Sequence, residues 1–150
     1  MWHHERRRLQ VAANVERSRD PVLTALAVAM GLMAISNFFK PISQAAAPDS
    51  NAGFVFFGHR LHGLANAVIG PAFGVLLATY AYGVWTRRRW VIPLALAYAA
   101  YVVLNLVLFT LDPPPGSDAP FVFLMVYALV AIGVSSGGAL YLYRNRETLS

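Results

Sequence analysis

Four long apolar runs, separated by short polar connections, constrain this chain more than any other feature of its sequence. They cover about residues 21–40, 61–85, 90–111 and 120–143 of 150. A helix needs about 20 residues to cross the roughly 30 Å of hydrocarbon in a bilayer, so each run is long enough to span a membrane. The sequence therefore predicts an all-α membrane protein, an antiparallel bundle of four transmembrane helices joined by short loops.

The composition supports lipid rather than water as the surroundings of this chain. Apolar residues make up 57% of it and charged residues 13%, whereas soluble domains carry about 25% charged residues. The bundle of residues 21–143 leaves a basic N-terminal segment, residues 1–20, and a tail, residues 144–150, both expected in the cytoplasm. These segments and the short loops leave no room for a soluble catalytic domain.

The basic residues predict the orientation of the helices. All but two of the 12 Lys and Arg residues lie on one side of the predicted membrane, and Lys and Arg in short loops favour the cytoplasmic side. We therefore expect a multi-pass protein of the cell (inner) membrane with both termini in the cytoplasm. The two exceptions are Lys40 and Arg60. The ten residues on the cytoplasmic side are Arg6, Arg7, Arg8, Arg17, Arg19, Arg87, Arg88, Arg89, Arg144 and Arg146.

The first apolar run is not expected to be a cleaved signal peptide. It is longer than the usual apolar core of such a peptide, which has about 7–15 residues. A possible Ala-x-Ala cleavage site, residues 45–47, is followed directly by Pro48. We expect this run to remain in the protein as its first membrane span.

The positive charge of the chain points to lipid partners. Its net charge of +5 and its pI near 10.0 could also suggest a nucleic-acid partner. However, arginines at the ends of membrane spans contact anionic lipid head groups. We expect membrane lipids as partners and no nucleic acid.

Missing residues exclude several classes of small four-span proteins. The chain has no cysteine, and none of its four apolar runs contains an acidic residue. Disulfide-forming quinone oxidoreductases and vitamin K reductases need cysteines. Small multidrug exporters need a glutamate inside a span, and lipoprotein signal peptidases need paired aspartates. No remaining motif identifies a family.

Small residues at helical spacing predict close helix packing. Between membrane helices, small side chains mark the faces where two backbones approach. The partner helix belongs either to this chain or to another subunit, so other membrane subunits or further copies of the chain are expected partners. The small residues are Gly63, Ala67, Gly70, Gly74, Ala78 and Ala81 in the second run, and Ala128, Ala131, Ser135 and Gly138 in the fourth.

Three of the runs carry polar side chains near the non-cytoplasmic side. Polar groups that face lipid are costly, so these side chains are expected to face the bundle interior or a wet cavity. One interpretation is an outward-facing pocket that binds a ligand. The alternative is that the charged residues are ordinary interfacial residues, while Asn66 and Asn105 form hydrogen bonds between helices. The candidate ligand-binding residues are Asn37, Lys40, His59, His62, Asn66, Tyr101, Asn105 and Asp112.

The first loop on this side, residues 41–60, is expected to be irregular because it is rich in Pro, Ala, Ser, Asp, Asn and Gly. Its end, residues 53–57, is strongly apolar. We expect its phenylalanines to lie in the membrane interface or to pack over the mouth of the bundle.

Metal binding and acid–base catalysis are secondary hypotheses for the histidines. His59 and His62 could share a metal ion, with Asp112 or Asp118 as a third ligand, but no signature spacing supports this. Either histidine could act as a general base, but no nucleophile or acid partner is visible inside the membrane. The sequence identifies no cofactor, metal or catalytic residue.

The sequence favours a non-enzymatic function. The leading hypothesis is a small integral membrane protein that acts as an accessory or assembly subunit of a larger membrane complex. Extensive small-residue faces and the lack of exposed domains favour it. The alternative is a protein that binds or transports a lipid, a quinone or a small polar solute through the outward-facing pocket.

Overall fold

The computed structural model describes residues 20–48, 53–114 and 120–150. Within them it contains four long helices: α2 (Pro21–Ala46), α3 (Gly63–Trp85), α4 (Val91–Leu111) and α5 (Phe121–Arg144). Each is long and apolar enough to cross a membrane. The prediction of four helices long and apolar enough to span a membrane is confirmed, as in a multi-pass membrane protein, while a short β-hairpin adds to the expected all-α fold. The expected basic segment lies outside the described residues, except for Asp20.

The start of α2 follows from its first two residues. Asp20 caps the helix, because its Oδ1 accepts hydrogen bonds from the backbone N–H groups of Val22 (2.8 Å) and Leu23 (3.4 Å). Pro21 occupies the first helical position, where its missing N–H costs nothing. The helix continues through Pro41 to Ala46, beyond the expected end near residue 40. A proline is tolerated in a membrane helix when neighbouring groups satisfy the freed backbone atoms.

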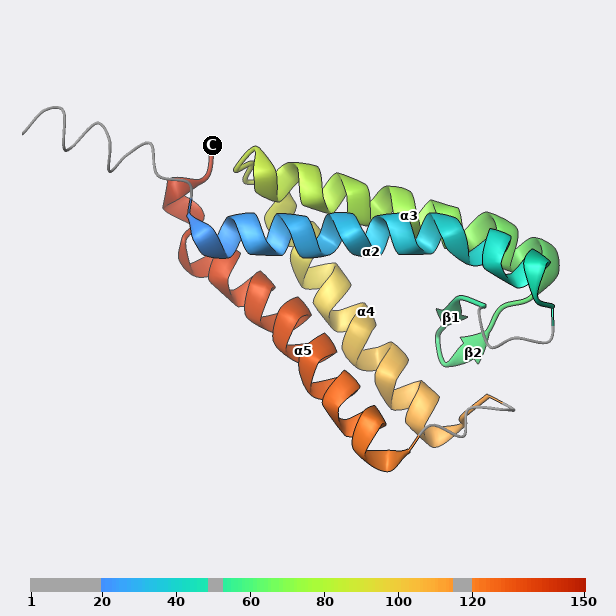
Figure 1. Ribbon diagram of the computed structural model, residues 1–150. Helices are drawn as coiled ribbons and strands as arrows, with labels where there is room; N and C mark the ends of the chain where they lie inside the picture. Colours follow the sequence, from blue (N-terminus) through green and yellow to red (C-terminus); the bar gives the residue numbers. More distant parts are fainter. Residues whose placement is uncertain (1–19, 49–52, 115–119) are drawn as a thin grey trace, which may run out of the picture.

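The four helices form two antiparallel pairs. α2 lies along α3 and α4 lies along α5, whereas α3 and α4 contact each other over only a few residues. Figure 1 shows that the pairs are close together near the C-terminus and diverge toward the opposite end. We call the end where the pairs are close together the C-terminal end. The end where they diverge holds a β-hairpin, residues 55–60, and we call it the hairpin end.

Glycines bring α2 and α3 together. A Cβ atom added at Gly74 would lie 3.1 Å from the Phe38 ring and 3.2 Å from the Ala34 carbonyl oxygen. One added at Gly70 would lie 3.4 Å from the Asn37 carbonyl oxygen. The expectation that these two glycines mark a packing face is confirmed, and the partner helix belongs to the same chain.

The C-terminal end holds the hydrophobic core and is closed by the last residues of the chain. Buried side chains of all four helices meet there, among them Tyr80, Val91 and Leu142. Beyond α5, a short helix η1 (Arg146–Thr148) leads back to the turn between α3 and α4. The Arg89 side chain donates to the Leu149 carbonyl oxygen (2.8 Å), and the backbone of Ser150 bonds with that of Arg87 and Arg89. These contacts join the two helix pairs at this end.

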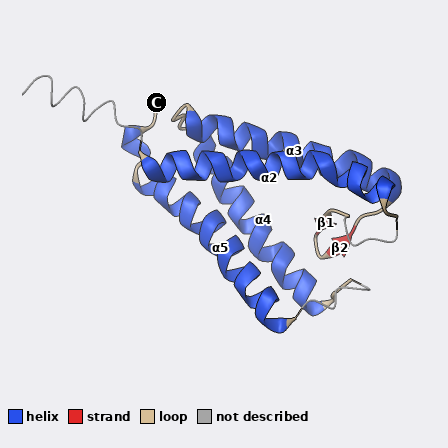
Figure 2. Ribbon diagram, viewed as in Figure 1, coloured by secondary structure: helices blue, strands red, loops and turns tan. Residues whose placement is uncertain are grey.

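A β-hairpin occupies the opening between the pairs at the hairpin end, as Figure 2 shows. Strand β1 (Val55–Phe56) pairs with β2 (His59–Arg60) in antiparallel register. Both residues of the connecting turn have positive φ, 47° at Phe57 and 81° at Gly58, as a two-residue hairpin turn of type I′ requires. The end of the first loop is therefore regular, contrary to the expectation of irregular chain.

Candidate functional site

The sequence-predicted polar residues mostly contact the hairpin. Two sets of side chains hold it, one from α2 and α3 and one from α4. His59 belongs to the hairpin itself and is exposed, and Asp112 is exposed at the end of α4. The residues that form hydrogen bonds with the hairpin or its base are Asn66, Tyr101 and Asn105. Lys40 lies over the Phe54 ring at the base, and the His62 ring contacts Gln44 of α2.

The base of the hairpin is bound by a buried amide network. Asn66, which is fully buried, accepts a hydrogen bond from the Phe54 backbone N–H (2.9 Å) and donates to Oε1 of Gln44 (2.8 Å). Gln44 in turn donates through Nε2 to the Leu61 carbonyl oxygen (3.2 Å), and the same atom lies 2.9 Å from Nδ1 of His62. These bonds connect α2, α3 and both ends of the hairpin.

The turn of the hairpin is bound by α4. The side-chain oxygen of Asn105 accepts a hydrogen bond from the Gly58 backbone N–H (3.0 Å). The Tyr101 hydroxyl donates to the Val55 carbonyl oxygen at 3.3 Å. A Cβ atom at Gly58 would lie 2.9 Å from the Leu108 backbone, so only glycine fits this approach. The hairpin therefore bridges the two helix pairs where they diverge.

Aromatic rings fill the space between the hairpin and the helices. The Phe73 ring on α3 lies 5.0 Å from that of Phe54 and 4.8 Å from that of Tyr101, centroid to centroid. Phe56 and Phe57 contact Tyr101 at 6.0 and 5.5 Å. Such ring pairs stabilise a fold by about 0.5–1.5 kcal/mol each beyond their burial. The phenylalanines therefore pack over the mouth between the pairs, one of the two positions expected for them.

Two buried polar atoms in the helices have no hydrogen-bond partner among the described residues. They are Oδ1 of Asn37, whose Nδ2 donates to the Met33 carbonyl oxygen (2.8 Å), and the hydroxyl of Tyr80. Asn37 is 5% exposed and Tyr80 is 0% exposed. Near Asn37, the Lys40 ammonium lies 4.7 Å from the centre of the Phe54 ring, a cation–π contact.

The described residues do not assemble a metal centre. No group of three His, Asp or Glu side chains comes together among them. Nδ1 of His62 is already engaged with Gln44. Asp118, one of the two suggested third ligands, lies outside the described residues.

Gln44 is the main residue of this site that the sequence analysis missed. The reason is Pro41, because a proline favours the start of a loop, whereas α2 continues through it to Ala46. A signal was available, because Gln44 follows Asn37 by seven residues, which puts both on one helix face. Both side chains are buried on that face.

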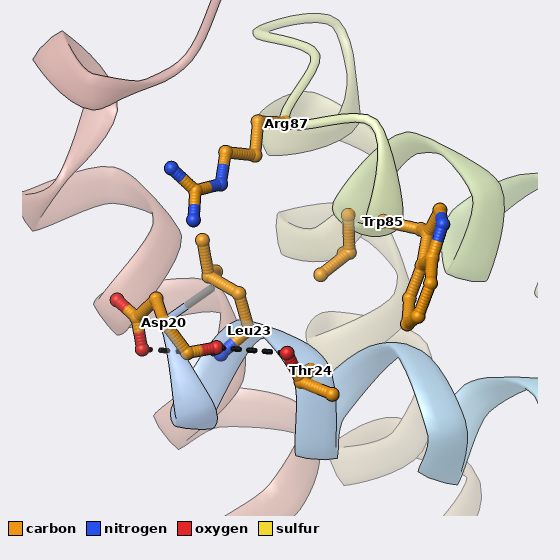
Figure 3. Close-up of a pocket in the computed structure, with 6 residues that line it drawn as sticks. Asp20, Leu23, Thr24, Trp85 and Arg87 are labelled. Atoms are coloured by element: carbon orange, nitrogen blue, oxygen red, sulfur yellow. Dashed lines mark hydrogen bonds between the residues drawn. The ribbon is translucent and has the colours of Figure 1, made fainter. Parts of the chain in front are cut away.

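A shallow hollow lies at the C-terminal end, between the start of α2 and the end of α3. Figure 3 shows Asp20 and Thr24 on one side, with Arg87 and Trp85 on the other. The Asp20 carboxylate accepts a hydrogen bond from the Tyr141 hydroxyl (2.5 Å), and this bond, more than the helix-cap bonds, holds its pKa below the usual value. The carboxylate thus joins α2 to α5, and its bonds are structural.

Comparison of the chain with protein-family models, with curated proteins and with solved structures finds no match.

Proposed function

We propose that this protein is a non-enzymatic accessory or assembly subunit of a larger membrane complex. The proposal is carried by the exposure of α5, which packs along α4 but leaves most of its apolar surface uncovered. Only 6% of the most apolar 18-residue stretch of α5 is buried, against 33% of the corresponding stretches of α2 and α3. A helix with so little cover inside its own chain has surface available for other membrane helices.

Two glycines on α5 support association through this helix. Gly133 and Gly137 are spaced as in the small-xxx-small pattern that lets membrane helices approach closely. A Cβ atom added at either position would meet nothing within 4 Å. The same spacing at Gly70 and Gly74 is already filled by α2, so the chain uses this pattern for packing within itself.

We further propose that the four helices lie in the cell (inner) membrane as one antiparallel unit with both termini in the cytoplasm. The arginines between α3 and α4 and after α5 support this orientation. Trp85, Trp90 and Tyr143, all about half exposed, lie at the same end. Aromatic side chains of this kind are enriched at membrane–water interfaces.

The experiment measures the mass of the complex extracted from native membranes in mild detergent, by native mass spectrometry. The wild-type chain should leave the membrane bound to partner subunits. Gly133→Ile and Gly137→Ile should release it as a smaller species, because the added side chains keep a partner backbone away. Gly31→Ile on α2, also in open space, is the matched control and should retain the wild-type mass. A wild-type monomer, or unchanged complexes in both α5 variants, would contradict the proposal.

The second candidate function is a protein that binds or transports a lipid, a quinone or a small polar solute. It is favoured by the buried Oδ1 of Asn37 and the Tyr80 hydroxyl, which have no partner among the described residues. The same preparation distinguishes the two functions. A stable monomer that keeps one small molecule, and loses it in an Asn37→Leu variant, would favour binding over assembly.

A further inference from the structure

The hydrogen bonds of the amide network at the base of the hairpin have a fixed order of donors and acceptors. It runs from the Phe54 N–H through Asn66 and Gln44 to the Leu61 carbonyl oxygen and to His62. Both backbone groups have roles that cannot change, since an N–H only donates and a carbonyl oxygen only accepts. The amides between them must therefore be oriented to suit both ends.

This order determines where the proton of His62 lies. Asn66 uses its oxygen for the Phe54 N–H, so its nitrogen donates and Gln44 must present its oxygen to it. The Gln44 nitrogen then faces both the Leu61 carbonyl oxygen and Nδ1 of His62. An amide nitrogen only donates, so Nδ1 must accept and carries no proton. The neutral ring holds its proton on Nε2.

A second proton on His62 is incompatible with this arrangement. It would place an N–H of the ring against an N–H of Gln44 across 2.9 Å. Rotating the Gln44 amide would offer His62 an oxygen but would put two donors face to face at Asn66. The same rotation would remove the donor from the Leu61 carbonyl oxygen. Leaving the amide as it is loses the bond between Gln44 and His62, whereas rotating it loses the bonds to Asn66 and to the Leu61 carbonyl oxygen.

We propose that His62 is a proton-operated latch for the β-hairpin. The neutral ring accepts a bond from the Gln44 amide that holds the hairpin base on α2. Uptake of a proton removes this support and loosens the hairpin base. The attachment therefore strengthens as the pH rises and weakens as it falls. Histidine is suited to this role because its charge changes between about pH 5 and pH 8.

The surroundings of the latch favour release when the ring is charged. His62 is exposed, so a proton from solution can reach it. On α2, α3 and the hairpin strands, the charged side chains and histidines are Lys40 of α2 and His59 and Arg60 of β2, while α3 has no charged residue. Neither the hairpin strands nor these two helices include an acidic residue to accept the new N–H.

The test is hydrogen exchange of the hairpin amides, measured by mass spectrometry on the full chain in lipid nanodiscs. Wild type is compared with His62→Asn at pH 8 and at pH 5. Asn offers Gln44 an amide oxygen near the position of Nδ1 and takes up no proton. Comparing the two proteins at one pH cancels the intrinsic exchange rate. At pH 8 the exchange rates of the hairpin amides in the two proteins should agree within about twofold. At pH 5 the hairpin amides of the wild type should exchange about tenfold faster than those of His62→Asn, because the loss of one hydrogen bond corresponds to roughly this factor.

A control variant and a spectroscopic measurement test the proposal further. His59→Asn, on the same hairpin, should respond to acid as the wild type does. The ¹⁵N spectrum of wild-type histidine at pH 8 should show Nδ1 of His62 without a proton and Nε2 with one, whether or not the variant folds. Equal exchange of wild type and His62→Asn at pH 5, loss of the acid response in His59→Asn, or a proton on Nδ1 would each overturn the proposal.

Discussion

At the scale of the residue, buried amides at the hairpin end are explained by the backbone groups that they satisfy. Asn66, one of the two asparagines expected to form hydrogen bonds between helices, is fully buried. Its two side-chain atoms bond to a hairpin amide and to another helix. Asn105 also bonds to the hairpin, through its oxygen. Whether either residue also contributes to ligand binding stays a prediction.

Replacing Asn66 with leucine should destabilise the protein strongly. The change leaves the Phe54 N–H and Oε1 of Gln44 without partners in a buried place, and each unsatisfied group costs about 1–3 kcal/mol. We expect the unfolding free energy to fall by roughly 2–4 kcal/mol. The measurement is reversible unfolding in mixed micelles. Thr79→Val, at an exposed site, should change little, and an equally mild effect of Asn66→Leu would show that the network does not hold the hairpin.

At the scale of the element, the two helix pairs are held together by different means. α2 and α3 approach through glycines, with Gly70 and Gly74 against α2. α4 and α5 are linked to the other pair by the hairpin at one end. At the other end, the tail contacts the turn between α3 and α4 and Tyr141 bonds to Asp20. The hairpin is therefore a structural element in its own right.

A larger side chain at Gly74 should separate α2 from α3. In Gly74→Leu the new atoms meet the Phe38 ring and the Ala34 carbonyl oxygen. Overpacking of this kind costs about 1–3 kcal/mol. Gly31→Leu on the neighbouring helix is the matched control, because nothing lies within 4 Å of its Cβ position. Thermal unfolding in detergent should show a lower midpoint for the first variant only, and similar midpoints for both would argue against a tight glycine contact.

At the scale of the whole molecule, the proposed orientation in the membrane rests on the distribution of charge. The C-terminal end carries the arginines of the α3–α4 turn and those that follow α5, whereas the hairpin end carries Lys40 and Arg60. Lys and Arg in short connections remain on the cytoplasmic side during insertion.

Labelling of single cysteines should report this orientation directly, since the chain has no cysteine of its own. Pro113→Cys, beyond α4, should react with a membrane-impermeant maleimide on intact cells. Glu147→Cys, beyond α5, should react only after the cells are opened. Both original residues are exposed, so access is not limited by folding. The reverse pattern of labelling would place the termini outside the cytoplasm.

The sequence by itself determined the four helices and the start of α2 at Asp20. In a bilayer each spanning segment must satisfy its own backbone hydrogen bonds, so length and apolar character are sufficient to locate a helix. Only the tertiary structure decided which helices pair, that the chain near Phe57 and Gly58 forms a hairpin, and that Gln44 joins the polar site. A polar side chain is satisfied by groups distant in the sequence, and its partner is defined only once the chain has folded.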